Sequence, residues 1–462
     1  MGTAALMLGV SGLRGTVGET LTPDVVIRFA NAYATYLREN EKPANGTHFR
    51  LVFGRDTRPS GTIVRDAAFA ALTASGFEVI DLDIATTPAV ELMTRQLNAD
   101  AGMIATASHN PIIWNGVKLL TRAGMAPPPA AVTKIKALFD AQANSYVTVD
   151  RVIKPTTNTE ANARHVRAIT DLIDVNGIAS KRFKVVLDSV NGAGCVSTMT
   201  LLSKLGCVVK HLHGEPTGQF AHEPEPTAAN LVGLCDEVKK QKAAIGLAQD
   251  PDADRLAIVD EHGNYIGEEY TLALCSKFLL SKKAGGIAVA NLSTSRMIDD
   301  IAAQYGGRVI RTPVGEANVI DTMLRENAVV GGEGNGGVID PRVVPGRDSL
   351  TAIAYMLALM TRENKSVSEL VASIPRYEII KDKFDCKRED AERAVTACKA
   401  AFAGERFDTQ DGLRIDWSDG WVHARASNTE PIMRIIGEAP TKELARLRID
   451  AVRKVVDAAL KK

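Results

Sequence analysis

Ser108 and His109 follow a short apolar stretch around Met103 and Ile104 that reads as a buried strand. The chain then continues Asn-Pro111, and the residue before a proline is biased away from helix, so a turn is expected here. A serine hydroxyl beside an imidazole, in a loop with open backbone N–H groups, can carry a phosphoryl group, because such loops attract phosphate. An ordinary surface turn is the alternative for this stretch alone.

Asp250, Asp252 and Asp254 alternate directly after the apolar residues 244–248. In an extended loop alternate side chains point to one side, and three adjacent carboxylates raise one another's pKa unless a cation neutralises them. A hard divalent ion such as Mg²⁺ is the simplest cation for oxygen ligands. An EF-hand is disfavoured because Arg255 stands where that loop requires glycine, and residues 256–259 read as a strand. A solvated acidic turn is the alternative.

Two further loops have compositions suited to ligands. The stretch Gly331-Gly-Glu-Gly-Asn-Gly-Gly337 holds one charged side chain, Glu333, which could accept hydrogen bonds from hydroxyl groups while the glycines allow a close approach. The stretch Arg425-Ala-Ser-Asn-Thr-Glu-Pro431 offers a guanidinium, two hydroxyls and an amide, which is phosphate-binding chemistry. A flexible turn and a capped hairpin exit loop are the respective alternatives.

The elements that must position these loops alternate between strand and helix as far as residue 330. We expect strands at residues 51–53, 78–82, 103–104, 184–188, 207–212, 244–248, 256–259, 286–290, 308–311 and 328–330, and helices at 23–36, 62–74, 90–97, 195–205, 231–240, 269–280, 297–305 and 317–325. Such alternation predicts parallel or mixed α/β sheets, whose ligands bind at the carboxyl ends of the strands. Three consecutive segments share this pattern, which predicts a shared cleft.

The last part of the chain has a different pattern. Residues 376–385 read as a linker with an edge strand, followed by a helix at 389–402. Strands at 413–417 and 421–425 form a hairpin around a Ser-Asp-Gly turn, and a strand at 432–436 and a helix at 442–460 complete a small α+β domain.

Composition indicates a soluble globular protein of several domains: 462 residues, 45% apolar and 24% charged. Lysine plus arginine equals aspartate plus glutamate, 55 each, so charge gives no argument for a nucleic-acid or membrane partner. The first ten residues lack the basic region of a signal peptide, and the apolar run at 350–360 is too short to span a membrane. Six cysteines without a CxxC motif are typical of reduced thiols, so we expect a cytoplasmic protein.

Four motifs in order carry a family resemblance: Thr106-Ala-Ser-His-Asn-Pro-x-x-x-Asn-Gly-x-Lys118, Asp250-Pro-Asp-Ala-Asp-Arg255, Gly332-Glu-Gly-Asn-Gly336 and Arg425-Ala-Ser-Asn-Thr-Glu-Pro431. Together they resemble the signature loops of the alpha-D-phosphohexomutase family. The resemblance spans essentially the whole chain, including Gly12-Leu-Arg-Gly15, Phe220-Ala-His-Glu-Pro-Glu-Pro226 and Thr312-Pro-Val-Gly315.

This resemblance implies three related α/β sheet domains plus a C-terminal α+β domain of the TATA-binding-protein-like kind, around one central cleft. The expected domains are 1–158 with the catalytic serine loop, 159–262 with the metal-binding loop, 263–376 with the sugar-binding loop and 377–462 with the phosphate-binding loop.

The resemblance also implies a role for each matching residue. Ser108 would be the phosphorylated catalytic serine, and with Asp250, Asp252 and Asp254 it would hold Mg²⁺. Near the transferring phosphate would lie Arg14, His109, Lys118 and Arg255. Substrate would be bound by Glu333, Asn335, Arg425, Ser427, Asn428, Thr429 and Arg434. The sugar loop departs from the commoner Gly-Glu-x-Ser-Gly-His pattern, because Asn335 and Gly337 replace the serine and the histidine.

The implied activity is interconversion of hexose 6-phosphate and hexose 1-phosphate through a phosphoserine, with hexose 1,6-bisphosphate as intermediate and activator. Glucosamine phosphate is the favoured sugar, because the two substrate loops resemble those of amino-sugar mutases; mannose and glucose phosphates are alternatives. A metal-dependent sugar phosphatase would release inorganic phosphate instead, and a non-catalytic phosphosugar sensor would lack a phosphorylatable serine. We expect a phosphosugar as the only class of partner, with no nucleic acid or membrane, and a monomer or homodimer.

Overall fold

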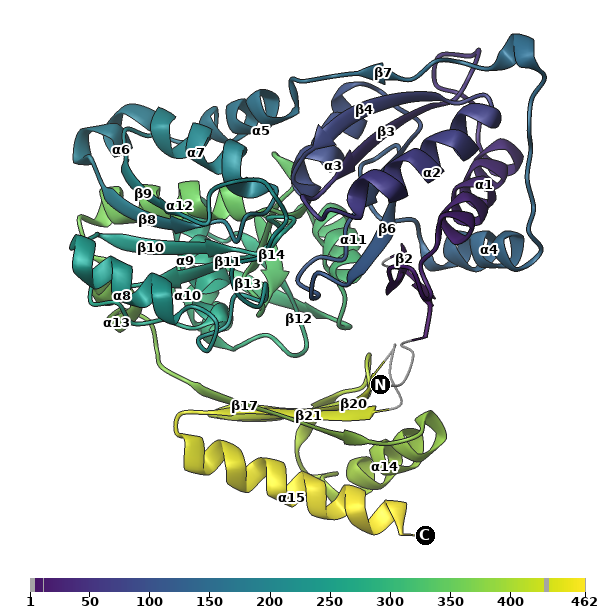
Figure 1. Ribbon diagram of the computed structural model, residues 1–462. Helices are drawn as coiled ribbons and strands as arrows, with labels where there is room; N and C mark the ends of the chain where they lie inside the picture. Colours follow the sequence, from purple (N-terminus) through teal and green to yellow (C-terminus); the bar gives the residue numbers. More distant parts are fainter. Residues whose placement is uncertain (1–4, 11, 428–431, 462) are drawn as a thin grey trace. The chain divides into compact units, whose positions relative to one another are not determined.

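The computed structural model describes residues 5–10, 12–427 and 432–461. The chain divides into two compact units. Figure 1 labels most of its helices and strands. One comprises the residues up to Thr271 together with Gly336–Ser368, and the other comprises Leu272–Asn335 and Glu369–Lys462. The first unit carries the serine and the three aspartates, and the second carries the Glu333 and Arg425 loops.

The first sheet has seven strands in the order β1-β2-β6-β5-β3-β4-β7. They are β1 (Met7–Gly9), β2 (Gly12–Thr16), β6 (Trp114–Thr121), β5 (Ala101–Ala105), β3 (Arg50–Arg55), β4 (Glu78–Ile84) and β7 (Thr156–Thr157). Its helices are α1 (Pro23–Asn40), α2 (Gly61–Ala74), α3 (Thr87–Gln96) and α4 (Pro129–Asp140). Leu51 and Phe53 pack with α1 and α2, whereas Val52 packs with α3, so both faces of β3 are covered.

Strand β6 is not indicated by sequence patterning, and it has direct consequences for the site. It lies antiparallel between β2 and β5, with Lys118 opposite Ile104 and Gly116 opposite Arg14. A Cβ atom at Gly116 would lie 2.3 Å from the carbonyl oxygen of Leu13, so only glycine allows this approach. The pairing places Lys118 beside β5, the strand that precedes Ser108, and Arg14 on the other side of β6.

The second sheet has the order β11-β10-β8-β9, with β11 antiparallel. Its strands are β8 (Lys184–Asp188), β9 (Val208–Leu212), β10 (Ile245–Gln249) and β11 (Leu256–Val259). The helices of this segment are α5 (Ala161–Thr170), α6 (Val175–Lys181), α7 (Gly194–Lys204) and α8 (Val232–Gln241), with the short 3-10 helix η1 (Val149–Arg151) before them. The first unit also contains the antiparallel pair β15 (Gly337–Asp340) and β16 (Val344–Arg347), followed by the buried helix α12 (Ser349–Glu363).

In the second unit, β12 (Ile287–Asn291) pairs in parallel with β13 (Arg308–Thr312) and with β14 (Val330–Glu333). The helices here are α10 (Met297–Gln304) and α11 (Glu316–Glu326), with α9 (Glu268–Leu280) and α13 (Val367–Ala372), which both start in the first unit. The last sheet is antiparallel, in the order β17 (Glu378–Asp385), β21 (Ile432–Ala439), β20 (Gly420–Ala426), β19 (Leu413–Trp417) and β18 (Arg406–Asp408). Helices α14 (Arg388–Ala401) and α15 (Lys442–Leu460) pack on one of its faces.

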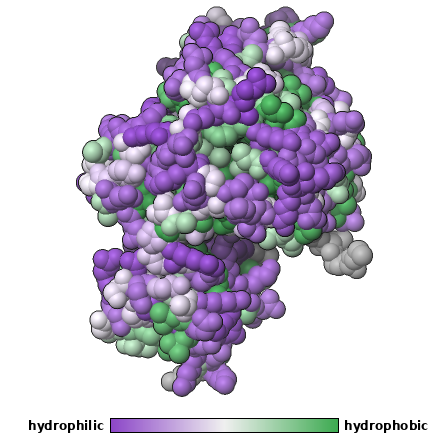
Figure 2. All heavy atoms as spheres, turned by 90° about the vertical axis from the view of Figure 1, so that its left-hand side faces the viewer, coloured by the Kyte–Doolittle hydropathy of each residue, from purple (hydrophilic) through white to green (hydrophobic). Residues whose placement is uncertain are grey.

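The predicted alternation of strands and helices is confirmed, including the edge strand β17 and the β19–β20 hairpin. Helix α3 begins at Thr87, before the predicted residue 90, because Thr86 caps it through the N–H of Ala89 and Pro88 occupies its first turn. On the face shown in Figure 2 hydrophilic residues predominate and hydrophobic ones lie in scattered groups. Within the described part of the chain, no helix combines the length and apolar character needed to cross a bilayer.

Candidate active site

Ser108 follows β5 and lies almost fully buried, with its backbone in the left-handed region (φ +50°). Its N–H donates to Thr106 Oγ1 at 2.9 Å, which helps hold this conformation. Left-handed backbone at a residue other than glycine is strained, and such strain is concentrated at functional sites. The Oγ lies 3.2 Å from Asp250 Oδ2 and 3.3 Å from His109 Nδ1. The hydroxyl is therefore held between a carboxylate and an imidazole.

Arg58, which sequence analysis missed, binds the backbone of the serine loop. The buried guanidinium donates to four carbonyl oxygens, those of Ser108, Asn110, Pro111 and Trp114, at 2.6–3.0 Å. Its Nε donates to Asp56 Oδ2 at 3.1 Å, so the cation is paired within the protein interior. A single arginine thus fixes the backbone of the whole turn.

Replacing Arg58 with alanine is expected to lower the free energy of unfolding by about 3–5 kcal/mol, because it leaves Asp56 as an uncompensated buried charge. Chemical denaturation measures this difference. The matched control is Arg164→Ala, which removes an exposed pair with Glu160 and should cost no more than about 0.5 kcal/mol. Equal, small losses in both variants would show that Arg58 does not support the loop.

The three aspartates follow β10 and are all buried. Asp252 Oδ2 accepts from Lys118 Nζ at 2.8 Å and from Thr87 Oγ1 at 2.7 Å. Asp250 Oδ1 accepts the backbone N–H groups of Asp254 and Arg255. One oxygen from each of the three aspartates lies within 4.8 Å of the others, so the group could hold a metal ion.

The electrostatics of this triad fit a divalent cation. Burial, with Asp254 and Asp252, raises the pKa of Asp250 well above its usual range. Against the effect of burial, Lys118 lowers the pKa of Asp252, and Arg347 and Lys118 lower the pKa of Asp254. The Oδ1 atoms of Asp252 and Asp254 are buried and have no hydrogen-bond partner among the described residues. A divalent cation bound by the triad would satisfy these buried carboxylate oxygens.

Four cations face the triad. Lys118 contacts two of the aspartates, Arg347 donates to Asp254 Oδ2 at 2.7 Å, and Arg255 Nε lies 3.9 Å from Asp254 Oδ1. Arg14 interacts electrostatically with Asp252 and Asp254, and burial lowers its pKa. Arg347 was not among the predicted site residues. Four positive side chains against three carboxylates leave a net charge of +1, which favours the binding of an anion.

His109 is neutral in this setting. Burial, assisted by Arg255 and Arg14, lowers its pKa to about 3. Glu225 Oε1 lies 3.9 Å from both His109 Nε2 and Arg255, which places a carboxylate of the 213–226 segment beside the serine loop. A neutral imidazole at 3.3 Å from the serine Oγ can accept a hydrogen bond from this hydroxyl.

The second unit brings the other two predicted loops together. Glu333 ends β14, is nearly buried, and its Oε1 accepts from Asn291 Nδ2 at 2.9 Å and from the N–H of Gly315 at 3.3 Å. Asn291 ends the neighbouring parallel strand β12. The carboxylate is therefore fixed at the carboxyl edge of its sheet, where ligands of α/β sheets bind.

Arg425 reaches the same 312–315 segment through Asp411. Its Nε donates to Asp411 Oδ2 at 2.9 Å, and the same oxygen accepts the N–H of Val314 at 3.0 Å. His423, two residues earlier on the same face of β20, bonds to the carbonyl of Asp411, and burial lowers the pKa of this histidine to about 4. The loops of Glu333 and Arg425 are thus linked by the residues between β13 and α11.

Most of the predicted site residues belong to one of two groups, one in each unit. Ser108, His109, Lys118, Arg14, Arg255 and the aspartates lie together in the first unit. In the second unit Arg434 lies opposite Arg425 in the β20–β21 pairing, Ser427 follows β20, and Asn335 follows β14. Asn428 and Thr429 lie outside the described residues. Sequence reasoning missed Thr87, Arg58, Arg347, Asn291 and Asp411, which belong to none of the four signature motifs. It also assigned no role to Glu225, although this residue lies in the Phe220–Pro226 motif.

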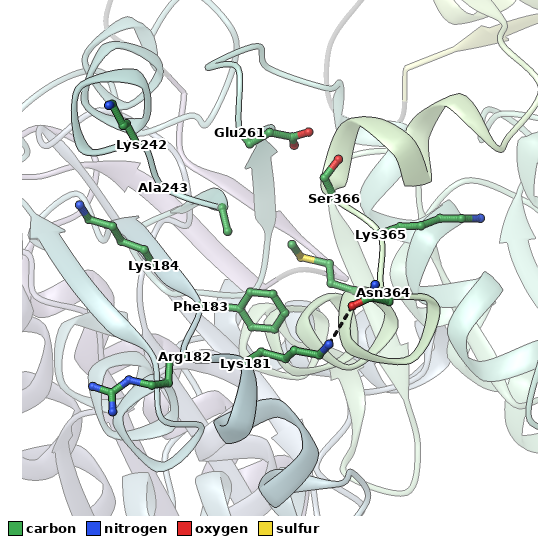
Figure 3. A pocket seen from close by; sticks show the side chains of 12 residues that line it. Lys181, Arg182, Phe183, Lys184, Lys242, Ala243, Glu261, Asn364, Lys365 and Ser366 are labelled. Carbon is green, nitrogen blue, oxygen red and sulfur yellow. Dashed lines mark hydrogen bonds between the residues drawn. The ribbon is translucent and has the colours of Figure 1, made fainter.

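A basic pocket of about 500 Å³ in the first unit contains none of the predicted site residues (Figure 3). It lies where α6, α8 and α12 end, each with a left-handed C-cap at Arg182, Lys242 or Asn364. Basic side chains offset the negative partial charge at helix C-termini. In Figure 3 Lys181 bonds to Asn364, while the ends of Arg182, Lys184 and Lys242 point away from the centre. The cations therefore do not converge on one anion.

Family comparisons match four models in series along the chain. Residues 5–145, 163–263 and 267–377 match phosphoglucomutase/phosphomannomutase alpha/beta/alpha domains I, II and III, and residues 383–455 match the C-terminal domain of that family. A Thermococcus kodakarensis protein named phosphoglucomutase/phosphomannomutase is 38% identical over 98% of this chain and 99% of its own. A Methanopyrus kandleri protein named "Probable phosphoglucosamine mutase" is 36% identical over 97% and 98%, respectively.

The fold is also found in a solved structure. A phosphoglucomutase/phosphomannomutase family protein from Burkholderia thailandensis matches with a TM-score of 0.84, at 24% identity, over 98% of both chains. At that identity the similarity shows the fold alone, which is the four-domain α/β architecture expected from the sequence. The chain therefore belongs to the phosphoglucomutase/phosphomannomutase family, the phosphohexomutases, which are intramolecular phosphotransferases of the isomerase class.

Proposed function

We propose that the chain interconverts hexose 6-phosphate and hexose 1-phosphate through a phosphorylated Ser108 and a hexose 1,6-bisphosphate, with glucosamine phosphate as the preferred sugar. One observation carries the proposal. The buried Ser108 hydroxyl lies 3.2 Å from Asp250, which belongs to a triad of buried aspartates faced by four cationic side chains. A phosphatase would share this geometry, but it would release inorganic phosphate. A phosphosugar sensor would not need the serine.

The chemistry of each half-reaction follows from the same residues. The bond between phosphorus and Ser108 Oγ breaks, a bond forms to the free hydroxyl of the sugar phosphate, and the proton of that hydroxyl leaves to a base. His109 Nδ1, 3.3 Å from Oγ, lies within hydrogen-bond reach of the oxygen that gains or loses the phosphoryl group. The bisphosphate then reverses, and its other phosphoryl group passes back to Ser108.

Positioning and charge neutralisation dominate phosphoryl transfer. Lys118, Arg14, Arg255 and Arg347 provide fixed positive charge around the Ser108 side chain and the triad. Phosphorylated Ser108 with Asp250, Asp252 and Asp254 would hold Mg²⁺, which when bound neutralises charge on the phosphoryl oxygens. The unpartnered oxygens of Asp252 and Asp254 support this ligand set.

Arg425 is proposed to bind the phosphate that does not react, with Ser427, Asn428, Thr429 and Arg434 nearby in the sequence. Arg425→Ala should weaken substrate binding about ten- to a hundredfold, because a charge-assisted hydrogen bond contributes about 1.5–3 kcal/mol. KM for the sugar phosphate measures this, and phosphorylation of Ser108 should persist.

The control for Arg425 is Arg446→Ala, which removes an exposed arginine of the same unit that pairs with Asp382. This change should leave KM unaltered. An unchanged KM in Arg425→Ala would show that the non-reacting phosphate binds at another site. Arg425→Lys should recover part of the binding, since lysine keeps the charge but loses the planar fork.

Glucosamine phosphate is favoured by the name of the Methanopyrus relative and by Glu333, whose fixed carboxylate could pair with a 2-ammonium group. The Thermococcus relative favours glucose or mannose phosphate, and a carboxylate also accepts ring hydroxyls. We expect glucosamine 1-phosphate to give the highest kcat/KM of the three sugars. A preference above tenfold for either neutral sugar, about 1.4 kcal/mol of transition-state binding, would reassign the substrate and keep the mutase mechanism.

A further inference from the structure

Asp188, His213 and His222 converge at the carboxyl edge of the second sheet. Asp188 ends β8, and His213 follows the neighbouring parallel strand β9. His213 Nδ1 lies 3.0 Å from Asp188 Oδ1, and His222 Nε2 lies 3.1 Å from Asp188 Oδ2. The aspartate is buried, while the His213 and His222 side chains are 37% and 21% exposed, so the group is open to solvent from one side.

The surroundings of His222 constrain its chemistry. Its Nδ1 lies 2.8 Å from the carbonyl oxygen of Glu223, and its Nε2 faces the Asp188 carboxylate. Both partners can only accept hydrogen bonds, whereas a neutral imidazole carries one N–H. With Nδ1–H donated to the carbonyl, the Nε2 lone pair would face an oxygen lone pair. Either the ring carries a second proton, or a cation lies between the nitrogen and the carboxylate.

The geometry resembles that of a metal centre. One donor atom from each of the three side chains lies within 4.8 Å of the other two, which is close enough for all three to contact one ion. A histidine that ligates a metal usually donates its other ring N–H to a carbonyl or carboxylate, and His222 Nδ1 lies 2.8 Å from the Glu223 carbonyl oxygen, within reach of such a bond. Asp188 Oδ1 also accepts the N–H of Val190, which fixes the carboxylate. The three side chains therefore present a preformed set of donors.

We propose that Asp188, His213 and His222 form a second metal site that takes a divalent ion of the Zn²⁺ class and leaves a coordination position open to solvent. Imidazole suits zinc, copper, iron and nickel, whereas Mg²⁺ prefers oxygen ligands, so this site and the aspartate triad select different ions. Three protein ligands with an open position are characteristic of zinc sites that are not purely structural.

The 213–222 segment lies next to the serine loop. An ion bound by His213 and His222 would therefore fix the position of this segment beside the loop. Phe220, two residues before His222, lies with its ring 4.9 Å from the Arg58 guanidinium, which holds the carbonyl of Ser108. Three residues beyond His222, Glu225 approaches His109 and Arg255. An ion at the base of this segment would act as a positioning element for the serine loop.

The test is a titration of the full chain with Co²⁺, as a spectroscopic substitute for Zn²⁺, after chelator treatment and in a large excess of Mg²⁺. We expect one Co²⁺ per chain with visible d–d absorption, displaced by one equivalent of Zn²⁺. His222→Ala and His213→Ala should each weaken this binding at least about 100-fold. His262→Ala, a 67% exposed histidine elsewhere in the same unit, and Asp252→Asn in the triad should keep it.

Failure of wild-type protein to bind Co²⁺ under these conditions would overturn the proposal and identify His222 as an imidazolium paired with Asp188. Undiminished binding by a folded His222→Ala or His213→Ala would also overturn it. Asp188→Asn gives a third variant that keeps an oxygen acceptor for the N–H of Val190, should either histidine variant fail to fold. Because Co²⁺ binding is measured without substrate, its result is independent of which sugar phosphate the enzyme converts.

Discussion

Ser108→Ala is expected to abolish turnover and to remove a phosphate group from the purified protein. The hydroxyl is the phosphoryl carrier in the proposed mechanism, and loss of a covalent nucleophile costs about 10⁴- to 10⁶-fold in rate. Wild-type protein should carry a phosphoryl group of about 80 Da on the peptide containing Ser108. Intact-mass and peptide mass spectrometry, together with steady-state rates, measure both effects.

Ser197→Ala is the matched control for this change. Ser197 lies in α7 of the same unit, is fully buried, and its Oγ has no hydrogen-bond partner within the described part of the chain. Its removal should alter neither phosphorylation nor rate. A fully active Ser108→Ala variant, or wild-type protein that is never phosphorylated during turnover, would falsify the phosphoserine mechanism.

Sequence patterning predicted those parts of the site whose functional residues are close together in the sequence. The three aspartates share one loop after a buried strand, and their spacing alone indicates a shared face. The structure places them as expected, with one oxygen of each within 4.8 Å of the others. The alternation of apolar strands and amphipathic helices likewise determines the α/β class, because buried strands are apolar on both faces.

Strand β6 was not predicted because Asn115-Gly in its first half reads as a turn. It pairs antiparallel with β5, the preceding strand, and on its other side with β2, which is distant in sequence. The register of a strand depends on the strands with which it pairs as well as on its own residues. The position of Lys118 beside the triad could therefore not be derived from the local sequence pattern.

Arg58, Arg347 and Asp411 were missed for the same reason. Each is a single charged residue, and its role depends on a partner more than ten residues away: Ser108, Asp254 and Arg425, respectively. A buried arginine is indistinguishable from a surface arginine in a sequence, because burial is decided by the tertiary contacts that satisfy its donors.

Asp252→Asn is expected to reduce kcat by at least about 10²-fold, a loss comparable with removing one preorganised group that stabilises transition-state charge. Asp252 Oδ2 binds Lys118 and Thr87, while its Oδ1 is among the buried oxygens that fit a cation. The amide keeps the shape of the side chain but removes the charge that fixes Lys118. Chelation of wild-type protein should have an effect of the same size, reversed by added Mg²⁺.

Asp260→Asn controls for the loss of one buried negative charge in the same segment. Asp260 directly follows β11, and its carboxylate accepts the backbone N–H groups of His262 and Asn264 rather than facing the triad. That variant should retain its rate and its dependence on Mg²⁺. Chelated wild-type enzyme that keeps full activity would remove the metal from the mechanism. A slow Asp252→Asn variant with an unchanged Mg²⁺ requirement would instead assign Asp252 to positioning Lys118. In that case loss of the Lys118 contact, and not loss of a metal ligand, would account for the lower rate.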